Sequence, residues 1–184
     1  SECERASCTE DYLQVVVDSL VDSPKRKYSL EITPQAQGFS HRLVVSYPED
    51  SDVNEYLMVV VPTKSKKGEA FLVDLDQKNI EIDEYKEGGK KIFGLLVESL
   101  GNGAKNLIVE WDVPIDESQE LSFVWQKQLG APNVESEVSF EYSPEIYEFV
   151  SSDPHPLLTK EGSLGYNTSL SEDFSLKIKW QTKN

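Results

Sequence analysis

The stretch Phe174-Ser-Leu-Lys-Ile-Lys-Trp180 alternates apolar and polar residues without a break. Side chains of a β-strand point alternately to opposite faces. One face of this segment would therefore carry only Phe174, Leu176, Ile178 and Trp180, and the other face would carry a serine and two lysines. Strict alternation of this kind indicates a strand with one buried and one solvated face.

Two further stretches alternate in the same way and also contain a tryptophan. They are Leu107-Ile-Val-Glu-Trp111-Asp-Val113 and Leu121-Ser-Phe-Val-Trp125-Gln126. Other strand-like runs recur along the chain, separated by turn signals such as Gly88-Gly89. A parallel α/β fold needs long helical patterns between its strands, and the sequence contains none. We therefore predict an all-β, antiparallel β-sandwich of Ig-like or jelly-roll character.

The strand pattern divides the chain into three segments. Residues 1–24 form an amino-terminal segment, in which we predict a strand over residues 12–17. Residues 25–115 hold the main sandwich, and their apolar run Leu57-Met-Val-Val-Val61 is typical of a strand buried on both faces. Residues 116–184 either complete that sandwich or form a smaller second β-subdomain.

The charge balance is strongly acidic, with 33 Asp and Glu residues against 18 Lys and Arg residues and a formal net charge of −15. Such a surface repels nucleic-acid phosphates and anionic lipid headgroups, so we expect no nucleic-acid partner. No run approaches the roughly 18 apolar residues of a membrane span, so we expect no direct membrane insertion. Solubility is the simplest explanation of the acidity, and binding of a cation or a basic partner is the alternative.

Cys3 and Cys8 are the only cysteines in the chain. Two cysteines are too few for a metal site, so they form either a small disulfide-closed loop or two free thiols. Together with the sequon Asn167-Thr-Ser169, this cysteine usage favours an exported protein. Cys3 and Cys8 are thus disulfide candidates, and Asn167 is a glycosylation candidate.

The sequence offers little that could carry out catalysis. His41 lies in a strand pattern, His155 lies between two prolines, and neither adjoins a nucleophile motif. A core or surface histidine is the simpler interpretation of each. Glu110 and Asp112 could form a carboxylate pair, although solvated acids on one strand face explain them better. We predict no enzyme activity, no catalytic residue, no metal and no cofactor.

Two loops begin like ligand-binding motifs and then depart from them. Asp50-Ser-Asp52-Val-Asn54 has the opening spacing of a calcium loop, but Glu55 stands where an EF-hand requires glycine. A looser calcium site between sandwich loops stays open. Gly101-Asn-Gly103 begins like a dinucleotide-binding loop but leads into a strand, so a hairpin turn explains it better.

The tryptophans have two interpretations. Exposed in a row, Trp111, Trp125 and Trp180 would form a platform on which sugar rings stack. Each is in phase with the inward apolar residues of its strand, however, which favours core packing. Burying one such side chain contributes roughly 1.5–3 kcal/mol from its area alone.

A series of motifs resembles a known bacterial family over most of the chain. The motifs are Cys8-Thr-Glu-Asp11-Tyr-Leu-Gln-Val-Val16, Tyr56-Leu-Met-Val-Val-Val-Pro62, Gly89-Lys-Lys-Ile-Phe-Gly94, Leu107-Ile-Val-Glu-Trp-Asp-Val-Pro114, Leu121-Ser-Phe-Val-Trp-Gln-Lys-Gln-Leu-Gly130 and Tyr166 to Trp180. This series resembles the carboxy-terminal β-rich region of the bacterial domain-of-unknown-function family number four thousand and twelve. The resemblance implies a membrane-anchored surface protein whose β-rich region lies outside the cytoplasm, and it carries over no functional residue.

From these observations we expect a non-enzymatic, extracytoplasmic module of a bacterial surface protein, anchored by a segment upstream of Ser1. Its role would be structural or adhesive, with a protein or a glycan as its partner. A carbohydrate-binding module is the first alternative. An acid-dependent hydrolase that uses two loop carboxylates is the second.

Overall fold

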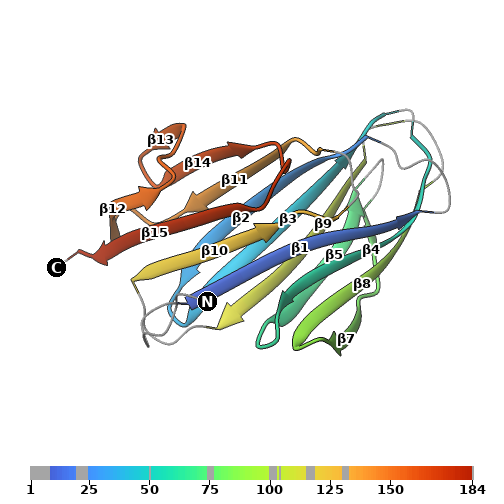
Figure 1. The fold of residues 1–184 in the computed structure, drawn as a ribbon, viewed down its shortest axis with the longest axis horizontal. Helices are drawn as coiled ribbons and strands as arrows, with labels where there is room; N and C mark the ends of the chain where they lie inside the picture. Colours follow the sequence, from blue (N-terminus) through green and yellow to red (C-terminus); the bar gives the residue numbers. More distant parts are fainter. Residues whose placement is uncertain are drawn as a thin grey trace.

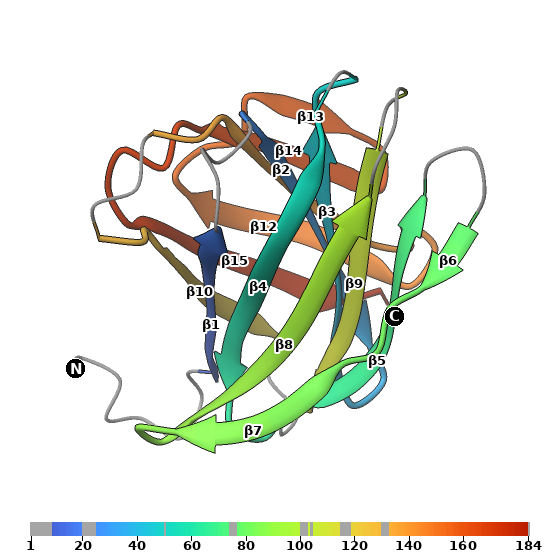
Figure 2. The ribbon, with the colours of Figure 1, turned by 90° about the vertical axis from the view of Figure 1, so that its right-hand side faces the viewer.

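The computed structural model describes residues 9–19, 25–49, 51–73, 77–99, 103, 105–114, 119–129 and 133–183. Within these ranges the chain forms fifteen β-strands and no helix. The strands make two sheets that pack face to face (Figures 1 and 2). The predicted all-β sandwich is therefore confirmed.

Sheet A has seven strands and sheet B has eight. In spatial order, sheet A contains β12 (Tyr147–Asp153), β15 (Phe174–Thr182), β10 (Glu120–Gln126), β1 (Thr9–Ser19), β4 (Val53–Pro62), β8 (Lys90–Ser99) and β7 (Asp83–Glu87). Sheet B contains β13 (Leu158–Lys160), β14 (Ser163–Thr168), β11 (Ser136–Glu141), β2 (Lys27–Gln35), β3 (Gly38–Tyr47), β9 (Lys105–Pro114), β5 (Lys66–Val73) and β6 (Gln77–Asn79).

Both sheets are mixed, which refines the prediction of an antiparallel sandwich. β1 runs parallel to β10, and β2 runs parallel to β11, whereas the other described pairings are antiparallel. Alternation along one strand specifies which face is buried but not the direction of the neighbouring strand. The two parallel strand pairs therefore could not be predicted from the sequence pattern.

The described strands of the three sequence segments are distributed over the two sheets. The amino-terminal segment contains β1, a central strand of sheet A that includes the predicted strand at 12–17. The strands after residue 116 are divided between the sheets: β10, β12 and β15 join sheet A, and β11, β13 and β14 join sheet B. The strands after residue 116 thus contribute to both layers of the sandwich.

All three tryptophans are buried between the sheets, with exposed fractions of 1% for Trp111 and Trp125 and 7% for Trp180. Trp125 of sheet A packs against Tyr28 of sheet B with ring centroids 5.9 Å apart. Trp180 of sheet A meets Phe39 of sheet B edge to face at 5.5 Å. Aromatic contacts of this kind join the two layers. The prediction of core packing is confirmed, and these three rings cannot serve as a sugar-stacking platform.

A buried hydrogen bond links the two sheets near one end of β3. Asp11 of sheet A contacts His41 of sheet B through carboxylate Oδ2 and imidazole Nε2, and both side chains are fully buried. The backbone N–H of Tyr12 donates to the other carboxylate oxygen at 2.8 Å. The His41 ring stacks on Trp111 at 5.0 Å with an interplanar angle of 13°. His41 is thus a core residue that bridges the layers.

A second buried polar cluster links the sheets at the other end of β3. The Tyr47 hydroxyl of sheet B donates to Glu55 Oε1 of sheet A at 2.6 Å. Arg26, just before β2, donates to the same oxygen at 3.0 Å, and its second terminal nitrogen lies 3.0 Å from Oε2. The side chains of Arg26 and Glu55 are almost fully buried. A charged carboxylate is tolerated at this depth because both partners are present.

We expect His41→Leu to lower the free energy of unfolding by about 3–5 kcal/mol, because it leaves the Asp11 carboxylate buried without its partner. The double variant Asp11→Leu/His41→Leu removes both polar groups and should recover most of that loss. Urea unfolding measures both values. Arg42→Leu, on the solvated face of the same strand, is the control and should cost less than about 1 kcal/mol. A double variant as unstable as His41→Leu would contradict the assigned pairing.

The buried tyrosines predict a loss of stability at alkaline pH. Burial raises the pKa of Tyr28 to about 12, and burial together with the Glu55 carboxylate raises the pKa of Tyr47. Above about pH 10 the unfolded chain releases phenol protons that the folded chain retains, so the free energy of unfolding falls as pH rises. Tyr28→Phe should make the fall of the free energy of unfolding with pH less steep between pH 10 and 11, by up to about 1.4 kcal/mol per pH unit. Equal slopes in urea titrations of the two proteins would refute this assignment.

Candidate functional site

The outer face of sheet A carries several large apolar side chains where β1, β4, β8 and β7 lie side by side. Along β4, Leu57, Val59 and Val61 point inward and are completely buried. The intervening residues Tyr56, Met58 and Val60 must then point outward, because side chains alternate along a strand. β4 therefore presents large apolar side chains to both the core and the outer surface.

The strand register places the outward residues in rows across the sheet. Val60 of β4 pairs with Ile92 of β8, which pairs with Tyr85 of β7. In the next row Met58 pairs with Gly94, and in the row after that Tyr56 pairs with Leu96. The three rows form one contiguous surface.

Gly94 allows two tyrosine side chains to converge on this surface. A methyl group at Gly94 would overlap the Tyr56 hydroxyl and stand 2.6 Å from its Cζ, so the Tyr56 ring occupies the space that a side chain would fill. From the other side, the Tyr85 hydroxyl reaches the Met58 sulfur at 3.4 Å. The pKa of Tyr56 is raised by burial first and then by the neighbouring Tyr85 and Asp83.

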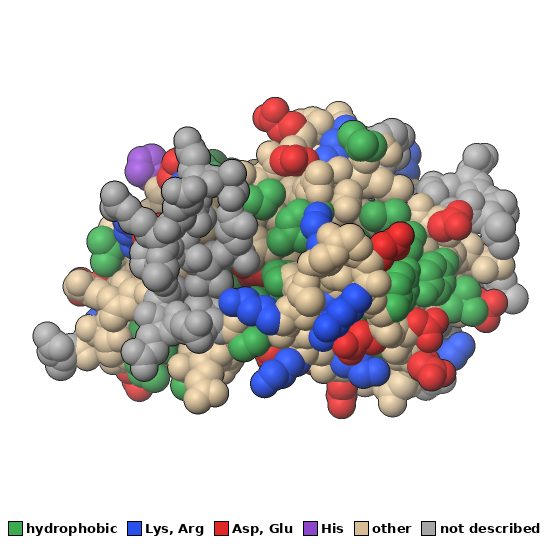
Figure 3. Space-filling view, turned by 60° about the horizontal axis from the view of Figure 1, so that its bottom comes forward, with side chains coloured by type: hydrophobic (Ala, Val, Ile, Leu, Met, Phe, Trp, Pro, Cys, Tyr) green, Lys and Arg blue, Asp and Glu red, His purple; other side chains and the backbone are tan. Residues whose placement is uncertain are grey.

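We call the exposed and half-buried residues around Gly94 the tyrosine patch. Its members are Val16, Tyr56, Met58, Tyr85 and Leu96. Leu96 is 54% exposed and Tyr85 is 37% exposed, which is high for large apolar side chains. Figure 3 shows hydrophobic side chains gathered toward one end of this face, with acidic side chains beside them.

Several exposed acidic residues lie at the border of the tyrosine patch, together with Lys90, which lies opposite Glu87. Asp18 is paired with Tyr56 across the β1–β4 ladder, and Glu98 follows Leu96 on the same face of β8. Asp83 and Glu87 flank Tyr85 on β7. An apolar, aromatic and methionine-containing centre with a charged rim is the usual arrangement of a protein-binding surface.

The residues that the sequence singled out lie elsewhere or outside the described ranges. Cys3 and Cys8, the disulfide candidates, fall outside the described residues. Asn167 is exposed on β14 of sheet B. His155 is exposed in the loop after β12, and His41 belongs to the core. Among the described residues, the structure thus brings none of Asn167, His155 and His41 to the tyrosine patch.

The carboxylate and calcium hypotheses gain no supporting geometry. The Glu110 carboxylate accepts a hydrogen bond from Arg42 at 3.0 Å on the outer face of sheet B, as a solvated cross-strand pair. Asp50 and Gly101 lie outside the described residues, and Asp52 is exposed. In the part of the chain that the structure describes, no three His, Cys, Asp or Glu side chains are grouped closely enough to hold a metal ion.

Sequence reasoning identified part of the tyrosine patch without assigning it a role. The run Leu57 to Val61 predicted burial on both faces of one strand, and its outward residues Met58 and Val60 are half-buried and buried. Tyr85 was missed because it lies among charged residues, in Asp-Glu-Tyr-Lys-Glu. The continuous apolar run of β4 could have predicted the patch, because both faces of that strand carry large apolar side chains.

Comparisons with known proteins support the fold. No protein-family model and no curated protein matches the sequence, so the resemblance to family number four thousand and twelve stays a prediction. The crystal structure of a candidate nutrient binding protein from Legionella pneumophila is similar, with a TM-score of 0.52, 7% identity, 92% of this chain covered and 71% of that chain. Native leukotriene A4 hydrolase from Saccharomyces cerevisiae has a TM-score of 0.48 and 10% identity, over 85% of this chain and 29% of that enzyme.

At such low identity the similarity to the Legionella protein shows the fold alone. A search of the described residues for membrane-spanning helices found none that is long and apolar enough.

Replacing glycine by alanine in a strand normally stabilises a protein, but we expect Gly94→Ala to bring little or none of that gain, because the new methyl group displaces the end of the Tyr56 ring. In a Tyr56→Ser background the same change should be stabilising. A double-mutant cycle from urea unfolding should therefore give a coupling of at least about 0.5 kcal/mol between the two sites. Additive effects would show that the ring does not lie over Gly94.

Proposed function

We propose that this chain is a non-enzymatic, protein-binding module that works outside the cytoplasm, with the tyrosine patch as its contact surface. The observation that carries the proposal is the exposure of Leu96 and Tyr85 together on the outer face of sheet A. Leaving such side chains in water sacrifices the free energy that their burial provides, roughly 25 cal/mol per Å² of apolar surface. A partner that covers the patch recovers that free energy.

The composition of the patch favours a protein over a glycan. Tyrosine and methionine are enriched at protein interfaces, and residues at the apolar centre account for most of the binding energy. A sugar-binding face instead needs open, flat aromatic rings in a row. Here the Tyr56 ring is half-buried over Gly94, and aliphatic Leu96 is the most exposed member.

A location outside the cytoplasm rests on the sequence and on one structural observation. The sparse cysteine usage and the sequon favour export. The exposure of Asn167 on β14 is compatible with modification of that sequon. This part of the proposal is independent of the tyrosine patch.

Leu96→Ser tests the contact surface, and Leu158→Ser provides a matched control, because Leu158 is 50% exposed and lies on edge strand β13 of the other sheet. Peptide binders are first selected against the folded protein from a random displayed library. We expect Leu96→Ser to raise the Kd of the selected peptides at least about tenfold, as truncation within the core of an interface does. Leu158→Ser should leave their Kd within about twofold of the value for the natural protein.

Binders that are indifferent to Leu96→Ser would overturn the assignment of the surface. Binding on a glycan array that is lost in Tyr56→Ser would replace the protein partner with a carbohydrate. Reproducible turnover of hydrolase substrates by the folded protein would overturn the non-enzymatic role.

A further inference from the structure

β7 forms an open edge of sheet A directly beside the tyrosine patch. Among the described strands it pairs only with β8, and Figure 2 shows it as the outermost strand at the lower edge. All five of its residues are exposed. The backbone N–H and C=O groups on its outer side therefore lack a strand partner, and such groups are a template for an added strand.

The other described sheet edges are poorer templates. β6 and β13 have three residues each, and short edge strands resist pairing. β12 has seven residues, but its register is interrupted by a bulge at Val150. β7 instead pairs with β8 in continuous register from Asp83 to Glu87. It is the edge best shaped to receive another strand.

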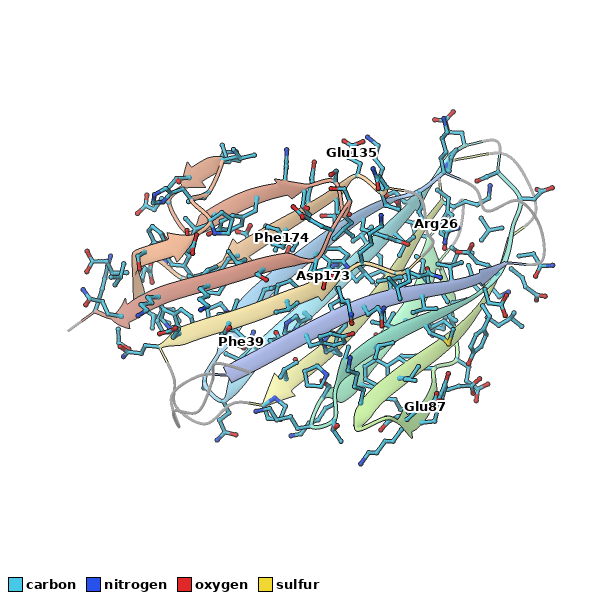
Figure 4. All side chains as sticks on the ribbon, in the orientation of Figure 1. Arg26, Phe39, Glu87, Glu135, Asp173 and Phe174 are labelled. Atoms are coloured by element: carbon cyan, nitrogen blue, oxygen red, sulfur yellow. The ribbon has the colours of Figure 1, made fainter. Side chains whose placement is uncertain are left out.

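The side chains of β7 differ between its two faces. Asp83, Tyr85 and Glu87 share the outer face with the tyrosine patch, and Figure 4 shows Glu87 at the solvent-exposed lower edge. On the inner face, Glu84 forms an ion pair with Lys91 at 2.8 Å. Among the described residues neither Asp83 nor Glu87 forms an ion pair, although Lys90 of β8 lies opposite Glu87 in the ladder. The outer face thus offers an acid, an aromatic ring and an acid at alternate positions.

This pattern opposes pairing of β7 with a second copy of the chain. In an antiparallel pair centred on Tyr85, Asp83 of each copy would lie opposite Glu87 of the other. Like charges directly opposite each other destabilise a ladder, and each copy carries a net charge of −15. The same two carboxylates attract a strand that carries positive charge at the matching positions.

We propose that β7 accepts an extended segment of the partner protein as an added strand, with the pattern basic–x–apolar–x–basic. The inference rests on the proposed function, because the apolar residue of the segment lies beside Tyr85 of the tyrosine patch and extends the outer-face row Val60–Ile92–Tyr85. The two basic residues lie opposite Asp83 and Glu87. Because the pattern reads the same in both directions, the segment fits either parallel or antiparallel to β7.

Three synthetic peptides serve as probes. The first, Thr-Arg-Thr-Val-Thr-Arg-Thr, places both arginines and the valine on one face of a strand. The second, Thr-Arg-Arg-Thr-Val-Thr-Thr, has the same composition but places the arginines on opposite faces. The third is the first peptide N-methylated at its five central residues, which keeps its charges and blocks strand pairing. Fluorescence anisotropy gives the Kd of each.

The matched variants remove two charges from opposite edges of the same sheet. Asp83→Asn/Glu87→Gln neutralises the β7 edge, and Glu148→Gln/Asp153→Asn neutralises the β12 edge. We expect the first peptide to bind the natural protein more tightly than the other two peptides do. Its Kd for the β7 variant should be about tenfold higher, as the loss of two cross-strand charge pairs implies. The β12 variant should bind it normally.

If both variants bind the first peptide equally weakly, or if the N-methylated peptide binds as tightly as the first, the peptides are attracted only to an acidic protein. Either result would overturn the inference. Concentration-dependent dimerisation that is strengthened by Asp83→Asn/Glu87→Gln would identify a second copy as the occupant and would also overturn it. If the alternating peptide fails while library-selected binders still depend on Leu96, the strand addition is wrong and the proposed function stands. If those binders also ignore Leu96, both proposals fail.

Discussion

The packing of the two inner sheet faces against each other determines where every other side chain of the sandwich points. Leu57, Val59 and Val61 of β4 are completely buried against sheet B, which leaves Tyr56 and Met58 on the outer face. A shift of β4 by one residue would exchange the two sets and expose the core. Because both sets contain large apolar side chains, the packing that forms the core also creates the exposed tyrosine patch.

Buried polar groups restrict this packing to one arrangement. The Asp11–His41 contact and the Glu55–Tyr47–Arg26 cluster join opposite sheets near the two ends of β3. Such groups contribute little net stability, but each becomes costly when it is buried without a partner. Alternative registers between the sheets would separate these partners and are therefore disfavoured. Because the register between the sheets is fixed in this way, the positions of the residues on the outer surface are fixed as well.

Much of the sandwich follows from local alternation, as in Phe174 to Trp180, whose inward residues pack in the core as predicted. The parallel pairing of β1 with β10 could not be predicted, because it joins segments more than a hundred residues apart whose directions leave no local trace. β7 was missed for another reason. Its charged residues have low strand propensity, and it forms a strand through pairing with β8. Tyr85, the residue of the tyrosine patch that lies on β7, was therefore not predicted either. The contact between Asp11 and His41 was also not predicted, because the two residues are distant in the sequence.

The central claim is that the tyrosine patch and the β7 edge act as one binding surface for an extended basic segment. Amide hydrogen exchange, followed by NMR with and without the alternating arginine–valine peptide, tests this claim most directly. The account predicts slowed exchange confined to amides of β7, together with shifts of the Tyr56 and Tyr85 ring signals. Slowed exchange at β12, or shifts without any protection at β7, would contradict it.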